Sequence, residues 1–149
     1  MQPFIPNALV RWSLITIGAF NALSAVGGGI GLLTPGSMGI PLYVIEGSVF
    51  PDFTWPAILL IVVIGGTQAL AVVAELRRAK SAHFLSALAG VAMLIFIFVE
   101  LAIMGGFSIL HGIYFATGLA QVSLVLALLD VLPGIVRGAP GATRAAALR

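Results

Sequence analysis

The chain of 149 residues is 60% hydrophobic and only 8% charged, with a mean hydropathy of +1.17. Soluble domains carry roughly a quarter charged residues, so this composition excludes a soluble globular protein and predicts one integral membrane domain. The absence of cysteine excludes disulfides, thiolate metal sites and cysteine nucleophiles. The net charge of +2 comes from seven scattered basic residues, which argues against nucleic acid as a partner.

The first predicted membrane span covers about residues 9–33, with Arg11 and Trp12 as an interfacial pair at its start. A secretory signal peptide is the alternative, with a possible cleavage site at residues 22–25. The apolar run continues to Leu33, however, and so reaches spanning length. Gly18, Gly28 and Gly31 recur at helical spacing, and Gly27 and Gly31 form a small-xxx-small pair. These small residues predict close packing of another helix from this chain or from a second copy.

The one long connection, residues 34–54, is rich in proline and glycine, which interrupt any regular helix. Many of its other residues are apolar, so we expect the loop to lie on the membrane surface or to fold back over the helix ends. It contains two acids, Glu46 and Asp52, and no basic residue.

Three more spans are predicted, at about residues 55–76, 82–104 and 109–132. The charged connector between the second and third spans contains Glu75 and Arg78, which are three residues apart and able to form an ion pair. His83 is interpreted as an interfacial residue. Residues 1–134 are therefore predicted to form an all-α, integral membrane four-helix bundle, followed by a tail over residues 135–149.

The basic residues indicate the topology of this bundle. All seven precede the first span, lie between the second and third, or follow the fourth: Arg11, Arg77, Arg78, Lys80, Arg137, Arg144 and Arg149. The positive-inside rule then predicts a multi-pass protein with both termini and the tail in the cytoplasm. The long loop and the Gly105-Gly106 turn would face outward.

Glu100 is the main candidate for function, because it interrupts the apolar run 94–103 and an ionisable residue inside a span is a functional hypothesis by default. It lies about four residues, or roughly 5–6 Å, below the outer end of the third span. The Gly105-Gly106 turn folds the last two spans into a hairpin, which brings His111 to the same depth. We therefore predict a Glu100–His111 pair.

Other polar residues are expected to complete a polar interior at mid-depth. Tyr114 and Gln121 share a helix face with His111, while Asn21 and Gln68 would approach from the first and second spans. Two interpretations remain open, an outward-facing ligand pocket and a purely structural network. Glu46 or Asp52 would be needed to add a further ligand, and Glu and His alone are too few for zinc, so neither a metal nor a cofactor is expected.

Residues 46–56, the segment EGSVFPDFTWP, resemble the outer loop of an uncharacterised family of small four-span bacterial inner-membrane proteins. A glycine pair like Gly65-Gly66 in the second span, and a glutamate like Glu100 late in the third, are also similar. The resemblance covers about residues 10–132 and implies a bacterial inner (plasma) membrane location and a four-helix architecture, but no reaction. A likeness to DoxX-type proteins rests on topology and size alone.

Two functions are compatible with these patterns. The first is a structural or accessory protein that packs with itself, as a homo-oligomer, or with a larger membrane complex, in contact with membrane lipids. The alternative is binding or transport of a lipid, a quinone or a small cation in the pocket around Glu100 and His111. No catalytic residue set is readable, so an enzyme is not expected.

Overall fold

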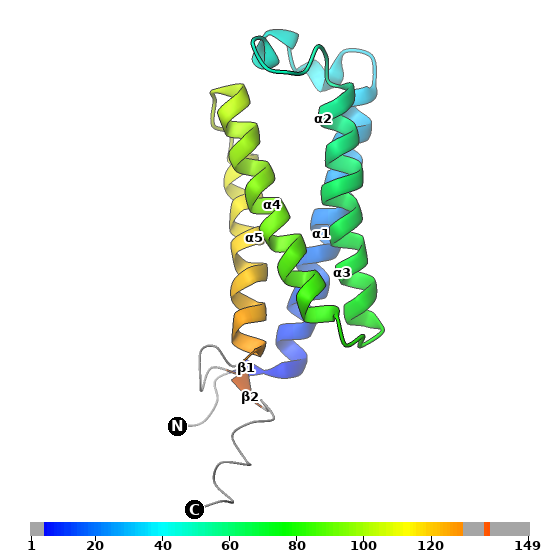
Figure 1. Ribbon diagram of the computed structural model, residues 1–149, viewed down its shortest axis with the longest axis vertical. Coiled ribbons are helices and arrows are strands. Elements are labelled where there is room, and N and C mark those ends of the chain that lie inside the picture. Colours follow the sequence, from blue (N-terminus) through cyan, green and yellow to red (C-terminus); the bar gives the residue numbers. More distant parts are fainter. Residues whose placement is uncertain (1–4, 130–135, 138–149) are drawn as a thin grey trace, which may run out of the picture.

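A computed structural model describes residues 5–129 and 136–137 of the chain. Four long helical segments run side by side as one elongated bundle (Figure 1). They are α1 (Asn7–Leu33); α2 (Thr54–Leu59), the π-helix η3 (Leu60–Gly65) and α3 (Gly66–Leu76), which together make the second segment; α4 (Ala82–Met104); and α5 (Ile109–Leu128). Each segment is long and apolar enough to cross a membrane. The predicted all-α architecture with four candidate spans is confirmed.

The predicted span boundaries agree with the helices to within two residues, except at the end of the fourth span. There α5 ends at Leu128, and the predicted end at residue 132 lies outside the described residues, as does the tail apart from residues 136–137. A short parallel pairing joins β1 (Ile5–Pro6) to β2 (Val136–Arg137). The start of α1 and the end of α5 therefore lie at one end of the bundle, which we call the inner end (Figure 1).

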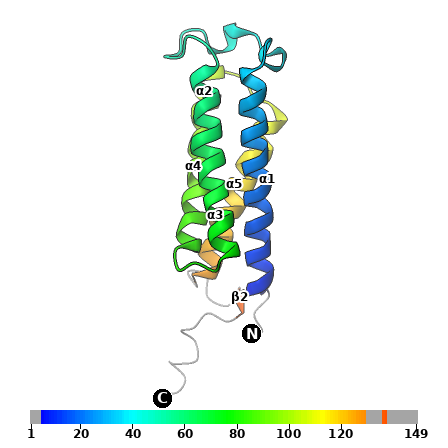
Figure 2. The same ribbon diagram turned by 90° about the vertical axis from the view of Figure 1, so that its right-hand side faces the viewer.

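The long loop covers the opposite end of the bundle, which we call the outer end (Figure 2). It contains two 3₁₀ turns, η1 (Ser37–Gly39) against α1 and η2 (Leu42–Ile45) against α4. Ile45 and Phe53 are buried beneath it, so the loop folds back over the helix ends, which is one of the two expected placements. The Asp52 carboxylate accepts a hydrogen bond from Thr54 N–H at 2.8 Å, where α2 begins.

Glycines allow the helices to approach closely at two crossings. Gly18 of α1 lies against Gln68 and Val72 of α3, where a Cβ would come within 2.8 Å of the Val72 side chain. Gly90 of α4 and Gly118 of α5 face each other, and a Cβ on either would lie 3.1–3.2 Å from the carbonyl oxygen of the other. Small residues therefore set the helix spacing inside this chain, as in other membrane bundles.

The helix contact predicted for Gly27 and Gly31 is wrong within this chain. A Cβ at Gly27 would meet no atom within 4 Å, and Gly31 lies against Met38 of the outer loop instead of against a helix. The face of α1 that packs inward is the one that carries Gly18 and Gly29, which are about three turns apart. Gly27 and Gly31 each lie two residues away from Gly29 and so point elsewhere.

The π-helix η3 interrupts the second span in its outer half. Thr67, one turn further along, places its hydroxyl 2.6 Å from the Val63 carbonyl oxygen and 3.2 Å from that of Ile64, where regular α-helical bonding is disturbed. Ile64 belongs to a buried cluster with Ala25 of α1 and Met93 and Ile97 of α4. This apolar cluster fills the outer half of the bundle beneath the loop.

Candidate functional site

Glu100 and His111 face each other across the α4–α5 hairpin at the outer end. Glu100 Oε2 lies 3.5 Å from His111 Nε2, so the predicted proximity of these two side chains is confirmed. The His111 side chain is only 7% exposed, whereas that of Glu100 is 34% exposed. Ordinary N–H···O hydrogen bonds span about 2.7–3.2 Å, so this contact is a loose electrostatic one with room to tighten.

The first turn of α5 fixes the orientation and the tautomer of His111. The backbone N–H of Ser108 donates a hydrogen bond to His111 Nδ1 at 3.0 Å. Because Nδ1 accepts this bond, it holds a lone pair, and the ring proton lies on Nε2, the nitrogen nearer Glu100. His111 is therefore a neutral imidazole that directs its single N–H toward a carboxylate.

Tyr114 lies one turn below His111 and is half-buried. Its ring stacks against Phe20 of α1, with 6.1 Å between ring centroids, and it packs against the apolar cluster described above. One turn further, Thr117 Oγ1 lies 3.0 Å from both Asn21 Oδ1 and the Tyr114 carbonyl oxygen. The single hydroxyl hydrogen of Thr117 therefore serves one of these two acceptors at a time.

Two fully buried glutamines form the polar centre of the bundle. Gln68 Nε2 donates to Gln121 Oε1 at 3.1 Å and to the Ala89 carbonyl oxygen at 3.2 Å, which joins α3, α4 and α5. The Thr117–Asn21 contact joins α5 to α1. The prediction that Gln68 faces another helix is confirmed, and the polar groups of this layer contact one another.

The structure separates the predicted site residues into two layers. Thr117, which contacts Asn21, lies six residues below His111, and Gln121 lies ten below it. These separations correspond to roughly 9 Å and 15 Å along α5. Asn21, Gln68 and Gln121 are therefore not brought to Glu100, and only His111 and, one turn away, Tyr114 lie near it.

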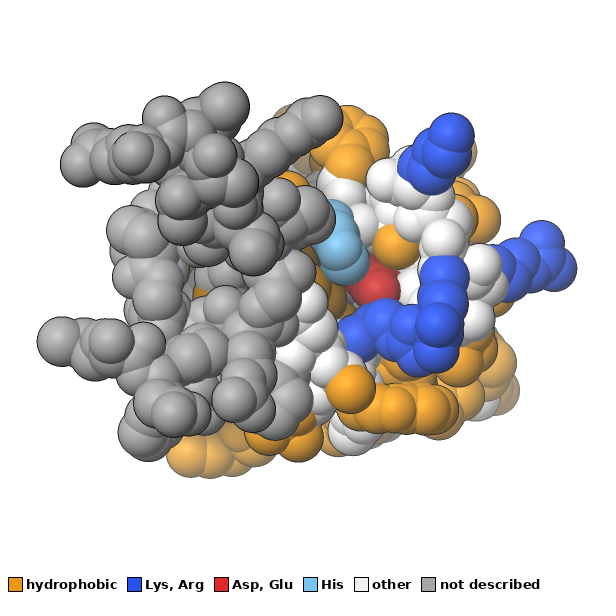
Figure 3. Space-filling view, turned by 90° about the horizontal axis from the view of Figure 1, so that it is seen from below, with side chains coloured by type: hydrophobic (Ala, Val, Ile, Leu, Met, Phe, Trp, Pro, Cys, Tyr) orange, Lys and Arg blue, Asp and Glu red, His pale blue; other side chains and the backbone are white. Residues whose placement is uncertain are grey.

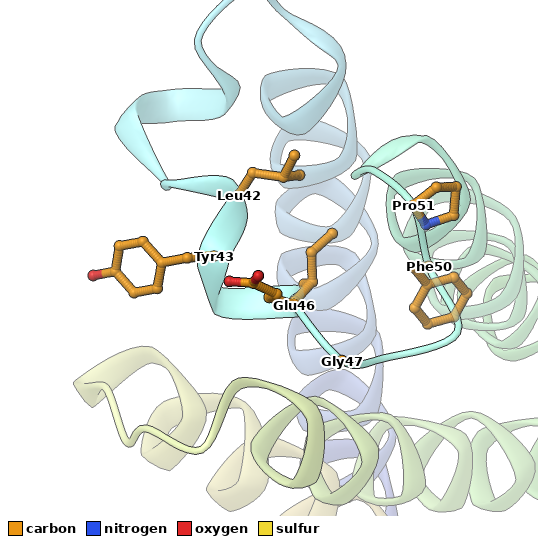
Figure 4. A pocket seen from close by; sticks show the side chains of 7 residues that line it. Leu42, Tyr43, Glu46, Gly47, Phe50 and Pro51 are labelled. Carbon is orange, nitrogen blue, oxygen red and sulfur yellow. The ribbon is translucent and has the colours of Figure 1, made fainter.

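Within the described residues, the two acids of the outer loop do not form a metal-binding group with Glu100 and His111. Glu46 and Asp52 are both exposed, and Glu46 lines a recess of about 450 Å³ together with Tyr43, Phe50 and Pro51. Figure 4 shows this recess, with the Tyr43 side chain pointing away from it. Within residues 5–129 and 136–137, no three His, Asp or Glu side chains are grouped so that they would hold a metal ion.

A second carboxylate–histidine pair lies at the inner end. Glu75 is 1% exposed, and its Oε1 atom accepts a hydrogen bond from Ser86 Oγ at 3.0 Å and lies 3.2 Å from His83 Nδ1. The His83 side chain is 41% exposed. Viewed from the inner end, an acidic side chain lies beside a histidine, with basic side chains at the rim (Figure 3).

This inner pair corrects the predicted partner of Glu75. The expected ion pair between Glu75 and Arg78 is not among the contacts of the described residues, because Glu75 points into the bundle toward α4 while Arg78 is exposed in the turn after α3. The sequence held a usable signal: Glu75 follows Gln68 by seven residues, or two helical turns. A residue on the same face as an inward glutamine is itself expected to point inward.

The chain was compared with family models, curated proteins and solved structures, and none of them matches. The resemblance to small four-span bacterial membrane proteins stays a prediction.

Proposed function

We propose that the protein is an integral membrane accessory protein, a compact bundle that packs with itself or with a larger membrane complex. The observation that carries this proposal is the apolar surface of the outer loop. Met38, Tyr43 and Val49 are 65%, 71% and 88% exposed, although the loop lies beyond the ends of the spans. These side chains supply apolar area outside the spans for contact with another molecule, and contiguous apolar area of this kind marks protein–protein interaction sites.

The interior of the bundle supports the same proposal. Gln68, Gln121, Asn21 and Thr117 connect all four helical segments through side-chain hydrogen bonds. Interhelical hydrogen bonds of this kind stabilise a fixed arrangement of membrane helices. A bundle held together in this way is suited to presenting a surface, and the proposal includes no chemical reaction.

A photo-crosslinking residue at Val49, in the native membrane, tests this proposal. We expect a discrete protein adduct at this loop position, and only lipid adducts from the matched position Leu70 on α3, which is 60% exposed along the span. Adducts with a second copy would identify a homo-oligomer, and adducts with another chain would identify a complex. Lipid adducts alone at Val49 would contradict the proposal.

The proposal also places the protein in the inner membrane of a bacterium, among its lipids, with both termini in the cytoplasm. The bacterial location rests on the resemblance of residues 46–56, and the orientation rests on the one-sided distribution of lysine and arginine along the sequence. Because the chain has no cysteine, Val49→Cys and Lys80→Cys each introduce one unique thiol. We expect an impermeant maleimide to label Val49→Cys in intact cells and Lys80→Cys only after the membrane is opened; the reverse pattern would invert the topology.

The Glu100–His111 pair favours a second candidate function, the binding or transport of a lipid, a quinone or a small cation. Glu100 is one-third exposed beside a neutral imidazole N–H, so an acceptor and a donor lie side by side near the outer surface. The test compares lipids and quinones that co-purify with the wild-type protein and with Glu100→Gln, together with binding of added Na⁺. Identical ligand content and identical Na⁺ binding would remove this candidate.

A further inference from the structure

The buried carboxylate of Glu75 is not used by either candidate function. Its Oε1 atom accepts a hydrogen bond from Ser86 Oγ and faces His83 Nδ1. Its Oε2 atom is buried and has no hydrogen-bond partner within the described part of the chain. An unpartnered polar atom in a membrane domain is strongly unfavourable, because no lipid group replaces the lost water. A buried carboxylate with such an oxygen is a candidate for binding a proton, because a neutral carboxyl group costs less to bury than a charged one.

The surroundings of Glu75 restrict what binds there. Because Oε2 is buried, a ligand of several heavy atoms does not reach it without rearrangement of the helices. Divalent cations require more oxygen or nitrogen ligands than one carboxylate, one imidazole and one hydroxyl supply. A proton needs neither this space nor further ligands.

His83 provides a route for this proton. Its Nδ1 atom lies 3.2 Å from Glu75 Oε1, and its side chain is 41% exposed at the inner end. We propose that Glu75 is a proton-binding site that exchanges with the inner aqueous phase through His83. In the exchange, the imidazolium of His83 releases its Nδ1 proton to Glu75 Oε1, the oxygen that it faces, which leaves a neutral imidazole and a neutral carboxylic acid. The imidazole then takes another proton from water.

Basic residues lie at the inner end together with Glu75 and His83. Gly18 lies against Gln68, and seven residues toward the inner end from each of them are Arg11 on α1 and Glu75 on α3, so these two share a level. Arg77, Arg78 and Lys80 lie exposed in the connector.

The small number of glutamates allows a direct test. The chain contains Glu46, Glu75 and Glu100, so the double variant Glu46→Gln/Glu100→Gln holds Glu75 as its single glutamate. With ¹³Cδ-labelled glutamate, the isotope-shifted infrared band of a protonated carboxyl belongs to Glu75 alone. We expect this band to appear on acidification of the full-length protein in lipid vesicles, while the protein stays folded.

Kinetics in the same labelled background test the role of His83. We expect His83→Gln to slow the hydrogen–deuterium exchange of this band by about tenfold or more, as for loss of a proton-transfer group. The matched control, Ser86→Ala, keeps the imidazole and is expected to leave the exchange rate within about twofold. A carboxyl that stays ionised at every pH, as a permanent ion pair with Arg11 would keep it, overturns the proposal, as does unchanged exchange in His83→Gln.

Discussion

The two ends of the bundle carry the same pair of residue types with opposite burial. At the outer end the imidazole of His111 is 7% exposed and the carboxylate of Glu100 is 34% exposed. At the inner end the carboxylate of Glu75 is 1% exposed and the imidazole of His83 is 41% exposed. The partner that is more exposed to water is therefore the carboxylate at the outer end and the imidazole at the inner end.

The difference follows from how each pair is attached to its helices. His111 is held by the N-terminal turn of α5, where the Ser108 N–H fixes its Nδ1 atom, so the carboxylate is the freer partner. Glu75 is held by Ser86 on the neighbouring helix, so the imidazole is the freer partner. The same residue types thus give a fixed donor at the outer end and a water-accessible proton carrier at the inner end.

The largest difference in the free energy of unfolding is expected between the two carboxylate variants. We expect Glu75→Ala to lower the free energy of unfolding by about 2–4 kcal/mol, because it leaves a cavity and removes the buried acceptor of Ser86. Glu100→Ala should lower it by less than about 1 kcal/mol, because a partly exposed pair is weak. Reversible unfolding in mixed micelles measures both, with Glu46→Ala as the exposed control. Equal losses would contradict the difference in burial.

Substitution of the glutamines that lie between the two pairs should lower the free energy of unfolding by an intermediate amount. Gln68→Leu removes the hydrogen bonds to Gln121 and to the Ala89 carbonyl, and we expect a loss of about 1–2 kcal/mol. A double-mutant cycle with Gln121→Leu should show coupling, because the second substitution removes a partner that the first has already left unpaired. Strictly additive losses would mean that the two amides do not interact in the membrane.

The smallest difference in the free energy of unfolding is expected between the two histidine variants. His111→Ala removes a side-chain acceptor from the first turn of α5, and we expect a loss of about 1 kcal/mol. His83→Ala removes a largely solvated partner and should cost less than about 0.5 kcal/mol. The same unfolding assay measures both variants. A larger loss for His83 would reverse the assignment of the fixed and the free imidazole.

Hydropathy and turn residues were sufficient to predict the four helical segments, because each span is apolar over its full length and the breaks at Pro51, Gly105 and the charged connector are unambiguous. The Glu100–His111 proximity was also predictable, because a tight turn fixes the depth of both residues. Both features depend on local sequence alone.

The interhelical features were harder to predict. The contact faces of α1 depend on its rotation in the bundle, so spacing alone predicts helix contacts at Gly27 and Gly31 as well as at Gly18, whereas Gly18 and Gly29 make the close contacts. The position of Glu75 in the charged connector, three residues before Arg78, predicts an ion pair between them that the structure does not form. Its seven-residue spacing from Gln68 was the better guide, since helix rotation decides which side chains are buried.

The central claim, that the outer imidazole is fixed and neutral while the inner one exchanges protons with water, is most directly tested by ¹⁵N-histidine NMR of the protein in lipid. The chain contains only two histidines, so His83→Gln assigns both signals. We expect His111 to show an unprotonated Nδ1 and a protonated Nε2, and the ring proton of the more exposed His83 to exchange with water faster than that of His111. Equal exchange of the two rings, or a proton on His111 Nδ1, would contradict the account.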